Sequence, residues 1–253
     1  MLVAQISDIH AGPNSPSLFA FERAIDWLKA FRPDALVLTG DLVDDGWRQG
    51  YRRIAESLRS LDFPAYLLPG NGDDQPVLRD ELAGIGKWSN ASGSMHFHAV
   101  LDEVALFGVD VTVAGQSYGD ILPHLEWLRS GLADTATPAL LFMHQPPFGI
   151  GIDVLDQVGC RNGDALLELL QAMECPPLGI FCGHVHRPVF GRAGLITLQT
   201  CGSLCPPNPL LLGNRRDLPV FDAPSFLMHE VRNDGLLSHV VSMRSVAGAG
   251  EEW

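Results

Sequence analysis

The chain has 253 residues, of which 46% are hydrophobic and 19% are charged, and its formal net charge is −13. This composition is sufficient for a packed core, and its negative charge gives no long-range attraction for nucleic acid. A nucleic acid polymer is therefore not expected as a substrate. A small anionic substrate is still expected to bind if cations reverse the local field. The sequence contains no apolar run of about 18 residues or more, so we expect no membrane span and no membrane partner.

Cysteine usage and the first residues of the chain bear on location. The five cysteines are scattered and odd in number, which is typical of reduced and mostly buried thiols. The first apolar run begins almost at Met1 and leads directly into Asp8. A removable signal peptide would destroy that motif, so we expect a cytoplasmic protein.

The first third of the chain alternates short apolar runs with amphipathic stretches. Strands are expected at 1–7, 35–39 and 65–68, and helices at 17–31 and 47–61. In the first helix Leu18, Phe21 and Ile25 recur at helical spacing, and Ser17 is a plausible N-cap. The order strand, helix, strand, helix, strand predicts a parallel sheet covered by helices, and hence an α/β fold.

Later segments predict more strands and fewer helices. Strands are expected at 94–100, 104–109, 139–143, 178–182, 188–191, 195–198, 225–231 and 236–243, and helices at 122–132 and 163–173. The stretch Pro206 to Pro219 is rich in Pro, Leu and Arg and predicts a long loop near the site. Because no repeat or low-complexity linker divides the chain, we expect one domain over 1–253. Its residues from about 200 onward would supply a substrate-side loop and the final strands.

Polar residues follow five of the predicted strands. The motifs are Asp8-Ile9-His10, Gly40-Asp41-Leu42-Val43-Asp44, Gly70-Asn71-Gly72-Asp73, His144-Gln145-Pro146-Pro147 and Gly183-His184-Val185-His186. These motifs lie at the carboxyl ends of their strands, and in open α/β sheets ligands bind at that edge of the sheet. Carboxylate, imidazole and amide groups suit divalent ions such as Mn, Fe, Zn or Co. No cysteine belongs to these motifs, which argues against a structural zinc site.

Two of the motifs pair their ligands at a spacing of two residues. In Asp8-x-His10 and His184-x-His186 the two side chains are expected to point to the same side of an extended segment. They would then serve one ion or two adjacent ions.

The order of these motifs resembles the calcineurin-like metallophosphoesterases, over about residues 1 to 200. Within them it looks most like the class III cyclic nucleotide phosphodiesterase and glycerophosphodiesterase branch. The signs of that branch are Gly183 to Pro188, Met143 to Pro147, and Gly115 followed by Leu122-x-x-Leu125-x-Trp127-Leu128. The resemblance implies a four-layer αββα sandwich of two mixed β-sheets flanked by helices.

The resemblance also implies a role for each motif residue. Asp8, His10, Asp41 and His186 would hold a first divalent ion, Asp41 would bridge, and Asn71, His144 and His184 would complete a second. Two ions about 3.5–4 Å apart activate a bridging hydroxide for in-line attack on phosphorus. Asp44 and Asp73 would orient ligands and local backbone. The expected substrate is a small phosphodiester. A phosphomonoesterase with the same mechanism is the alternative, and a non-catalytic metal-binding scaffold or a nuclease is a more distant one.

One position departs from the family pattern. The family usually has Gly-Asn-His-Asp where this chain has Gly70-Asn71-Gly72-Asp73. By resemblance, the missing His contacts the phosphate and protonates the leaving group. Asp41, Asn71 and His98 are taken as the catalytic residues, with His98, His96 or Asp74 replacing the lost acid. Alternatively the leaving group needs no acid, or Gly72 makes room for a bulkier substrate. We therefore expect aryl phosphodiesters to be cleaved better than alkyl ones.

Three further features surround the motifs. Gln145 stands where many relatives carry a second His. The segment from Thr200 through Arg216 could form part of a substrate wall. Arg187, Arg215 and Arg216 could meet a phosphate, with solvated surface arginines as the alternative. A homo-oligomer is compatible with the sequence.

Overall fold

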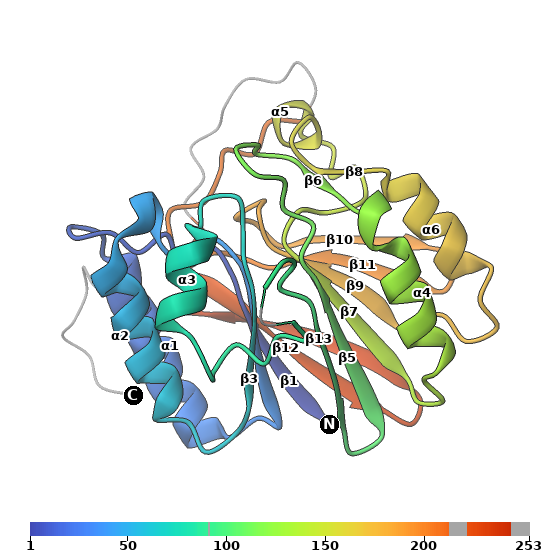
Figure 1. The fold of residues 1–253 in the computed structure, drawn as a ribbon, viewed down its shortest axis with the longest axis horizontal. Coiled ribbons are helices and arrows are strands. Elements are labelled where there is room, and N and C mark those ends of the chain that lie inside the picture. Colours follow the sequence, from blue (N-terminus) through green and yellow to red (C-terminus); the bar gives the residue numbers. More distant parts are fainter. Residues whose placement is uncertain (91, 213–221, 244–253) are drawn as a thin grey trace.

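Two β-sheets lie face to face in the computed structural model, which describes residues 1–90, 92–212 and 222–243 (Figure 1). The first sheet has the order β13-β12-β1-β2-β3. Its strands are β1 (Leu2–Ile6), β2 (Ala35–Thr39), β3 (Ala65–Leu68), β12 (Ser225–Arg232) and β13 (Gly235–Ser242). Strands β1, β2 and β3 pair in parallel, whereas β12 runs antiparallel to β1, so this sheet is mixed.

The second sheet has the order β10-β11-β9-β7-β5-β4. Its strands are β4 (Phe97–Leu101), β5 (Val104–Val109), β7 (Ala139–Met143), β9 (Gly179–Cys182), β10 (Val189–Ala193) and β11 (Ile196–Thr200). The four inner strands are parallel, and the two edge strands β4 and β10 are antiparallel to their neighbours. A small parallel pair, β6 (Gly119–Asp120) and β8 (Cys160–Arg161), lies apart from both sheets.

Helices cover the outer face of each sheet. Helices α1 (Ser17–Phe31), α2 (Arg48–Arg59) and α3 (Gln75–Glu81) lie on the left in Figure 1, and α4 (Leu125–Ala133) and α6 (Gly163–Gln171) on the right. Shorter helical turns are η1 (Asp44–Gly46), η2 (Leu122–His124) and α5 (Asp153–Asp156). The expectation of a four-layer αββα sandwich is therefore confirmed.

Three apolar layers hold the sandwich together. The layer between the sheets contains Val37, Phe97, Leu106, Phe142 and Phe181. One further layer lies between each sheet and the helices that cover it. Strands β2, β5 and β7 are buried at every residue because both of their faces are covered. That double burial explains why these strands read as continuous apolar runs rather than as alternating ones.

Several local expectations differ from the structure. Helix α1 begins at Ser17 itself, and Pro16 precedes it without a side-chain cap, so the N-cap assignment was wrong. The Ser17 hydroxyl instead donates to the carbonyl of His10, at 3.2 Å. The predicted helix at 122–132 starts as a 3-10 turn around Pro123 before α4 begins. No helix or strand lies in 206–212, whereas 213–219 lies outside the described residues.

In the part of the chain that the structure describes, no helix has the length and apolar character needed to cross a membrane.

Candidate metal centre

The ends of β1 and β9 approach each other closely enough to exclude a side chain. A Cβ atom on Gly183 would collide with the hydroxyl of Ser7 and lie 2.9 Å from Asp8 Oδ2. The backbone N–H of His184 donates to both carboxylate oxygens of Asp8, at 3.1 and 3.0 Å. The glycine therefore lets the two sheets meet where the Asp8-x-His10 and His184-x-His186 motifs begin.

Both of these motifs adopt left-handed backbone. Asp8, His10, His184 and His186 have φ values of 53°, 47°, 67° and 56°, and Asp41 has 52°. These five account for half of the ten non-glycine residues with positive φ among the described residues. Each such residue costs on the order of 1–3 kcal/mol and persists only where its surroundings hold it. The expectation of an extended segment was wrong, because β1 ends at Ile6 and β9 at Cys182.

Two groups of potential ligand atoms share one carboxylate. The first group is Asp8, His10, Asp41 and His186, the second is Asp41, His144 and His184, and in each the atoms lie within 4.8 Å of one another.

Contacts across the two groups converge on the shared carboxylate. Oδ2 of Asp41 lies 3.3 Å from His10 Nε2 and 3.3 Å from His144 Nε2. His186 Nε2 lies 3.4 Å from Asp8 Oδ1. Asp41 is therefore placed between two sets of donors.

Asn71 contacts Gln145, the residue that follows His144 of the second group. Its Oδ1 accepts a hydrogen bond from Gln145 Nε2, at 3.3 Å. Asn71 also lines a cavity of about 440 Å³ between the segments that follow β3 and β5, together with Asp73, Asp74 and Thr112. The structure thus brings all seven predicted ligand residues to one edge of the sandwich.

The histidines of the centre are oriented through their second ring nitrogen. His10 Nδ1 donates to Asp44 Oδ1 at 2.6 Å, and His144 Nδ1 donates to the carbonyl of Thr39 at 2.7 Å. Such contacts fix the ring and the tautomer, which leaves Nε2 of each ring directed into the cluster. Asp44 therefore holds the ring of a candidate ligand.

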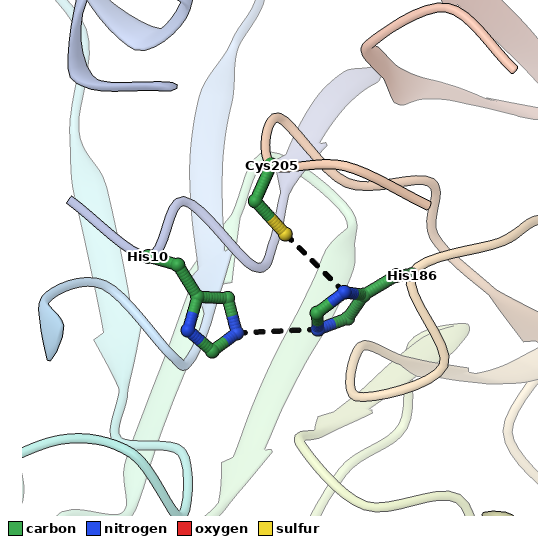
Figure 2. Close-up of side chains that lie close together, drawn as sticks. All are labelled: His10, His186 and Cys205. Atoms are coloured by element: carbon green, nitrogen blue, oxygen red, sulfur yellow. Dashed lines mark hydrogen bonds between the residues drawn. The ribbon is translucent and has the colours of Figure 1, made fainter. Parts of the chain in front are cut away.

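Cys205 is a member of this site that the sequence analysis missed. Figure 2 shows His10 and His186 with a nitrogen of each ring directed at the other ring, and the Cys205 sulfur next to His186. His186 Nδ1 lies 3.2 Å from Cys205 Sγ, and the two Nε2 atoms of His10 and His186 lie 3.2 Å apart. The strand predicted at 195–198 was the sequence feature that pointed to this position. A strand that pairs in parallel with β9 brings the residues that follow it to the same edge of the sheet.

Asp73 ties the backbone of two ligand-bearing segments together. Its Oδ1 accepts from the backbone N–H groups of Leu42 and Val43, at 3.0 and 3.2 Å, and its Oδ2 accepts from Gly70 at 2.9 Å. The Tyr51 hydroxyl also donates to Oδ1, at 2.9 Å. Burial and the nearby charge of Asp41 raise the pKa of Asp73 to about 6.

Opposite charges dominate the electrostatics of the cluster. Burial opposes protonation of His10, His144 and His186, but Asp41 and Asp8 outweigh it and raise their pKa values to about 10, 9 and 11. Burial and the charge of His144 lower the pKa of His184 to about 4. Against their own burial, His144 and His186 hold the pKa values of Asp41 and Asp8 below the usual range. The two carboxylates thus favour positive charge between them.

The donor set fits divalent metal ions. Nε2 of His184 is buried without a hydrogen-bond partner, and the buried Nε2 of His144 makes no hydrogen bond although Asp41 Oδ2 lies 3.3 Å away. Buried polar atoms of this kind are costly unless something binds them. Both nitrogens belong to the group that contains Asp41, so one ion there would bind both of them.

The structure does not bring His98 or His96 to this centre. On β4, His98 stacks on Phe107 at 4.2 Å between ring centroids, and Phe107 packs in the layer under α4. His98 therefore lies on the face of the sheet turned away from the sandwich interior. His96 is buried, accepts from the backbone N–H of Asp110, and lies 3.2 Å from His124. Of the three proposed acids, Asp74 alone lines the cavity beside Asn71.

The arginines proposed to meet a phosphate have different outcomes. Arg187 is paired with Asp222 at 2.8 Å and donates to the carbonyl of Asn208 at 3.1 Å, so its guanidinium is held in the fold. Arg215 and Arg216 lie outside the described residues, as does the end of the proposed substrate wall.

Comparison with known proteins agrees with the motifs and the fold. A family model described as "Calcineurin-like phosphoesterase" matches residues 1–188, so the chain belongs to this family. The expectations of this family and of a hydrolase acting on phosphoester bonds are confirmed.

Similar proteins cover from 69% to 98% of the chain. A glycerophosphodiester phosphodiesterase GpdQ of Enterobacter lignolyticus (strain SCF1) is 29% identical over 98% of this chain and 93% of its own length. A 3',5'-cyclic adenosine monophosphate phosphodiesterase CpdA of Escherichia coli (strain K12) is 33% identical over 69% of this chain and 65% of its own. The crystal structure of a dimetal phosphatase from Danio rerio shares the fold, with a TM-score of 0.71 at 13% identity over 96% of this chain and 98% of that one.

Proposed function

We propose that this protein hydrolyses small phosphodiesters at a centre of two divalent metal ions. The observation that carries the proposal is the sharing of Asp41 between two groups of donor atoms. A single ion would need one such group, and a structural site would be closed by four ligands without a shared carboxylate. The names of the two phosphodiesterase relatives support a diester rather than a monoester as substrate.

Each residue of the cluster then has a defined task. Asp8, His10, Asp41 and His186 would hold one ion, and Asp41, Asn71, His144 and His184 the other. When bound, two such ions supply an activated water and stabilise negative charge on the phosphoryl oxygens. Mn, Fe, Zn and Co all suit these ligands.

The protein's own groups set the geometry around that centre. The N–H of Gly72 donates to Asp41 Oδ1 at 2.7 Å, which leaves Oδ2 to face both donor groups. Asp44 and the carbonyl of Thr39 hold two of the rings. No imidazole occupies position 72, so an alkoxide leaving group lacks the family's acid, and Asp74 is the proposed substitute.

The proposed compartment is the cytoplasm. All five cysteines are free thiols, which suits a reducing environment.

A substrate panel with metal reconstitution tests the proposed function. Metal-free protein is loaded with each of the four metals and assayed on bis(p-nitrophenyl) phosphate and on p-nitrophenyl phosphate. Turnover of the first with little of the second is expected. The reverse preference would establish a phosphomonoesterase.

Replacement of the shared carboxylate tests the mechanism. Asp41→Asn should reduce turnover by at least about 10³-fold, because the ions contribute several kcal/mol of transition-state stabilisation. Asp45→Asn is the matched control, since Asp45 is exposed and belongs to neither donor group. No turnover of any phosphoester by metal-loaded protein, together with an effect of Asp41→Asn on stability alone, would instead indicate a metal-binding scaffold.

A further inference from the structure

Gln145 is a buried side chain whose two amide hydrogens are both engaged. It follows β7 and the candidate ligand His144, and it is 0% exposed. Its Nε2 donates to Asn71 Oδ1 at 3.3 Å and to the backbone carbonyl of Ser117 at 3.2 Å. Gln145 therefore connects a candidate metal ligand to the backbone of the segment before β6.

The contact with Ser117 determines which way both amides face. A backbone carbonyl can only accept a hydrogen bond, so the Gln145 atom beside Ser117 must be the NH₂ group. The Asn71 atom that meets the same NH₂ group must then be its carbonyl oxygen. The orientation of Asn71 is thus fixed by a chain of contacts that starts at a backbone group.

We infer that Gln145 is a positioning residue that holds Asn71 Oδ1 in place for the second metal ion. The inference rests on the ligand assignment proposed above. A carbonyl oxygen has two lone pairs, so Oδ1 can accept from Gln145 and still bind an ion. Without Gln145 the Asn71 amide is free to rotate and present its NH₂ group, which cannot bind a cation. Contacts of this kind typically contribute about 10–100-fold to metal affinity.

The chain offers a matched control residue. Gln199 in β11 is also 0% exposed, but neither of its amide atoms has a hydrogen-bond partner. It lies in β11, outside the five motifs that carry the candidate ligands. Gln145→Met and Gln199→Met therefore make the same chemical change in a buried glutamine, with and without a contact to Asn71.

Metal titration by calorimetry tests the inference without relying on turnover. Wild-type protein should bind two ions, and Asn71→Ala identifies the binding step that depends on Asn71. Gln145→Met and Gln145→Glu should weaken that same step by about 10-fold or more and leave the other step within about 2-fold. Gln199→Met should leave both steps unchanged. The visible spectrum of the Co(II)-loaded protein should change with Gln145 and not with Gln199.

A double-mutant cycle separates positioning from a general structural effect. If Gln145 acts through Asn71, Gln145→Met should add nothing to the loss caused by Asn71→Ala. Equal weakening of both steps, or a full additional loss in the double variant, would overturn the inference. Unchanged affinities in both folded Gln145 variants would do the same. If one variant does not fold, the other is scored. A wild-type protein that binds fewer than two ions would instead contradict the proposed function.

Discussion

At the scale of single residues, Gly72 distinguishes this centre from the family pattern. Its N–H donates to Asp41 Oδ1 at 2.7 Å, and an added Cβ would lie 3.2 Å from the same oxygen. The position has no left-handed φ, so a larger residue fits if the Asp41 carboxylate shifts by a few tenths of an ångström. A side chain at position 72 would therefore lie directly beside the proposed bridging residue.

Gly72→His should restore an acid for poor leaving groups. We expect its turnover of alkyl phosphodiesters, relative to aryl ones, to rise by at least about 10-fold over wild type, because general acid catalysis contributes about 10²–10⁴-fold and p-nitrophenolate needs little of it. A leaving-group series measured as kcat/KM checks this. Gly72→Ala controls for the added Cβ. An equal change of the alkyl-to-aryl ratio in both variants would contradict the missing-acid explanation.

The residues that the sequence identified share two properties, their chemistry and their place after a strand. Those properties were sufficient to predict that Asp8, Asp41 and His144 would meet. They were not sufficient for Cys205 or Gln145, whose contacts depend on how later segments return to the sheet edge. They were misleading for His98 because β-strand alternation, rather than sequence proximity, decides which face a side chain takes.

At the scale of elements, helix α2 anchors the segments that carry the ligands. The Tyr51 hydroxyl donates to Asp73 at 2.9 Å and accepts from the backbone N–H of Asp74 at 3.0 Å. Asp73 in turn accepts from the backbone at Leu42 and Gly70. One hydroxyl on α2 thereby joins the segments that follow β2 and β3.

Tyr51→Phe should lower the free energy of unfolding by about 1–3 kcal/mol, because it leaves a buried N–H and a carboxylate each without one partner. Denaturant unfolding measures the change. Tyr66→Phe is the control, since the Tyr66 hydroxyl makes no hydrogen bond among the described residues and the residue is also buried, at 6% exposed against 0% for Tyr51. The control should change the free energy by less than about 0.5 kcal/mol. Similar losses in both variants would show that the hydroxyl of Tyr51 is not the anchor.

Elements with a strong periodic or apolar pattern were predicted closely. The bounds of α1, β2, β3, β5 and β7 match those expected from the sequence. Helix α3 was missed because it spans only 7 residues, although Asp74 caps it and Pro76 stands in its first turn. The left-handed backbone of the ligand motifs was also missed, since Asp and His adopt it more often than most residues but still only in a minority of cases.

At the scale of the whole molecule, a neutral polar network crosses the apolar layer between the sheets. Gln5 on β1 donates to Thr39 Oγ1 at 3.0 Å and to the carbonyl of Cys182 on the other sheet at 3.2 Å. His229 Nε2 lies 3.1 Å from Gln5 Oε1, so this nitrogen carries the proton, and Nδ1 accepts from Ser238 at 2.8 Å. Every partner of this imidazole is uncharged.

This network makes the sandwich sensitive to acid. Burial lowers the pKa of His229 to about 3, whereas an unfolded histidine titrates near 6.5. Between these values the unfolded chain binds the extra proton, so the stability is complete above pH 6.5 and is lost as the pH falls. By pH 5 the loss from this residue is about 2 kcal/mol.

His229→Gln should therefore show a smaller fall in unfolding free energy between pH 7.5 and 5, by about that amount, in denaturant titrations. His239→Gln, on the exposed face of β13, should follow wild type. The metal centre is the same in all three proteins, so its own pH dependence cancels, and equal slopes in all three would contradict the assignment.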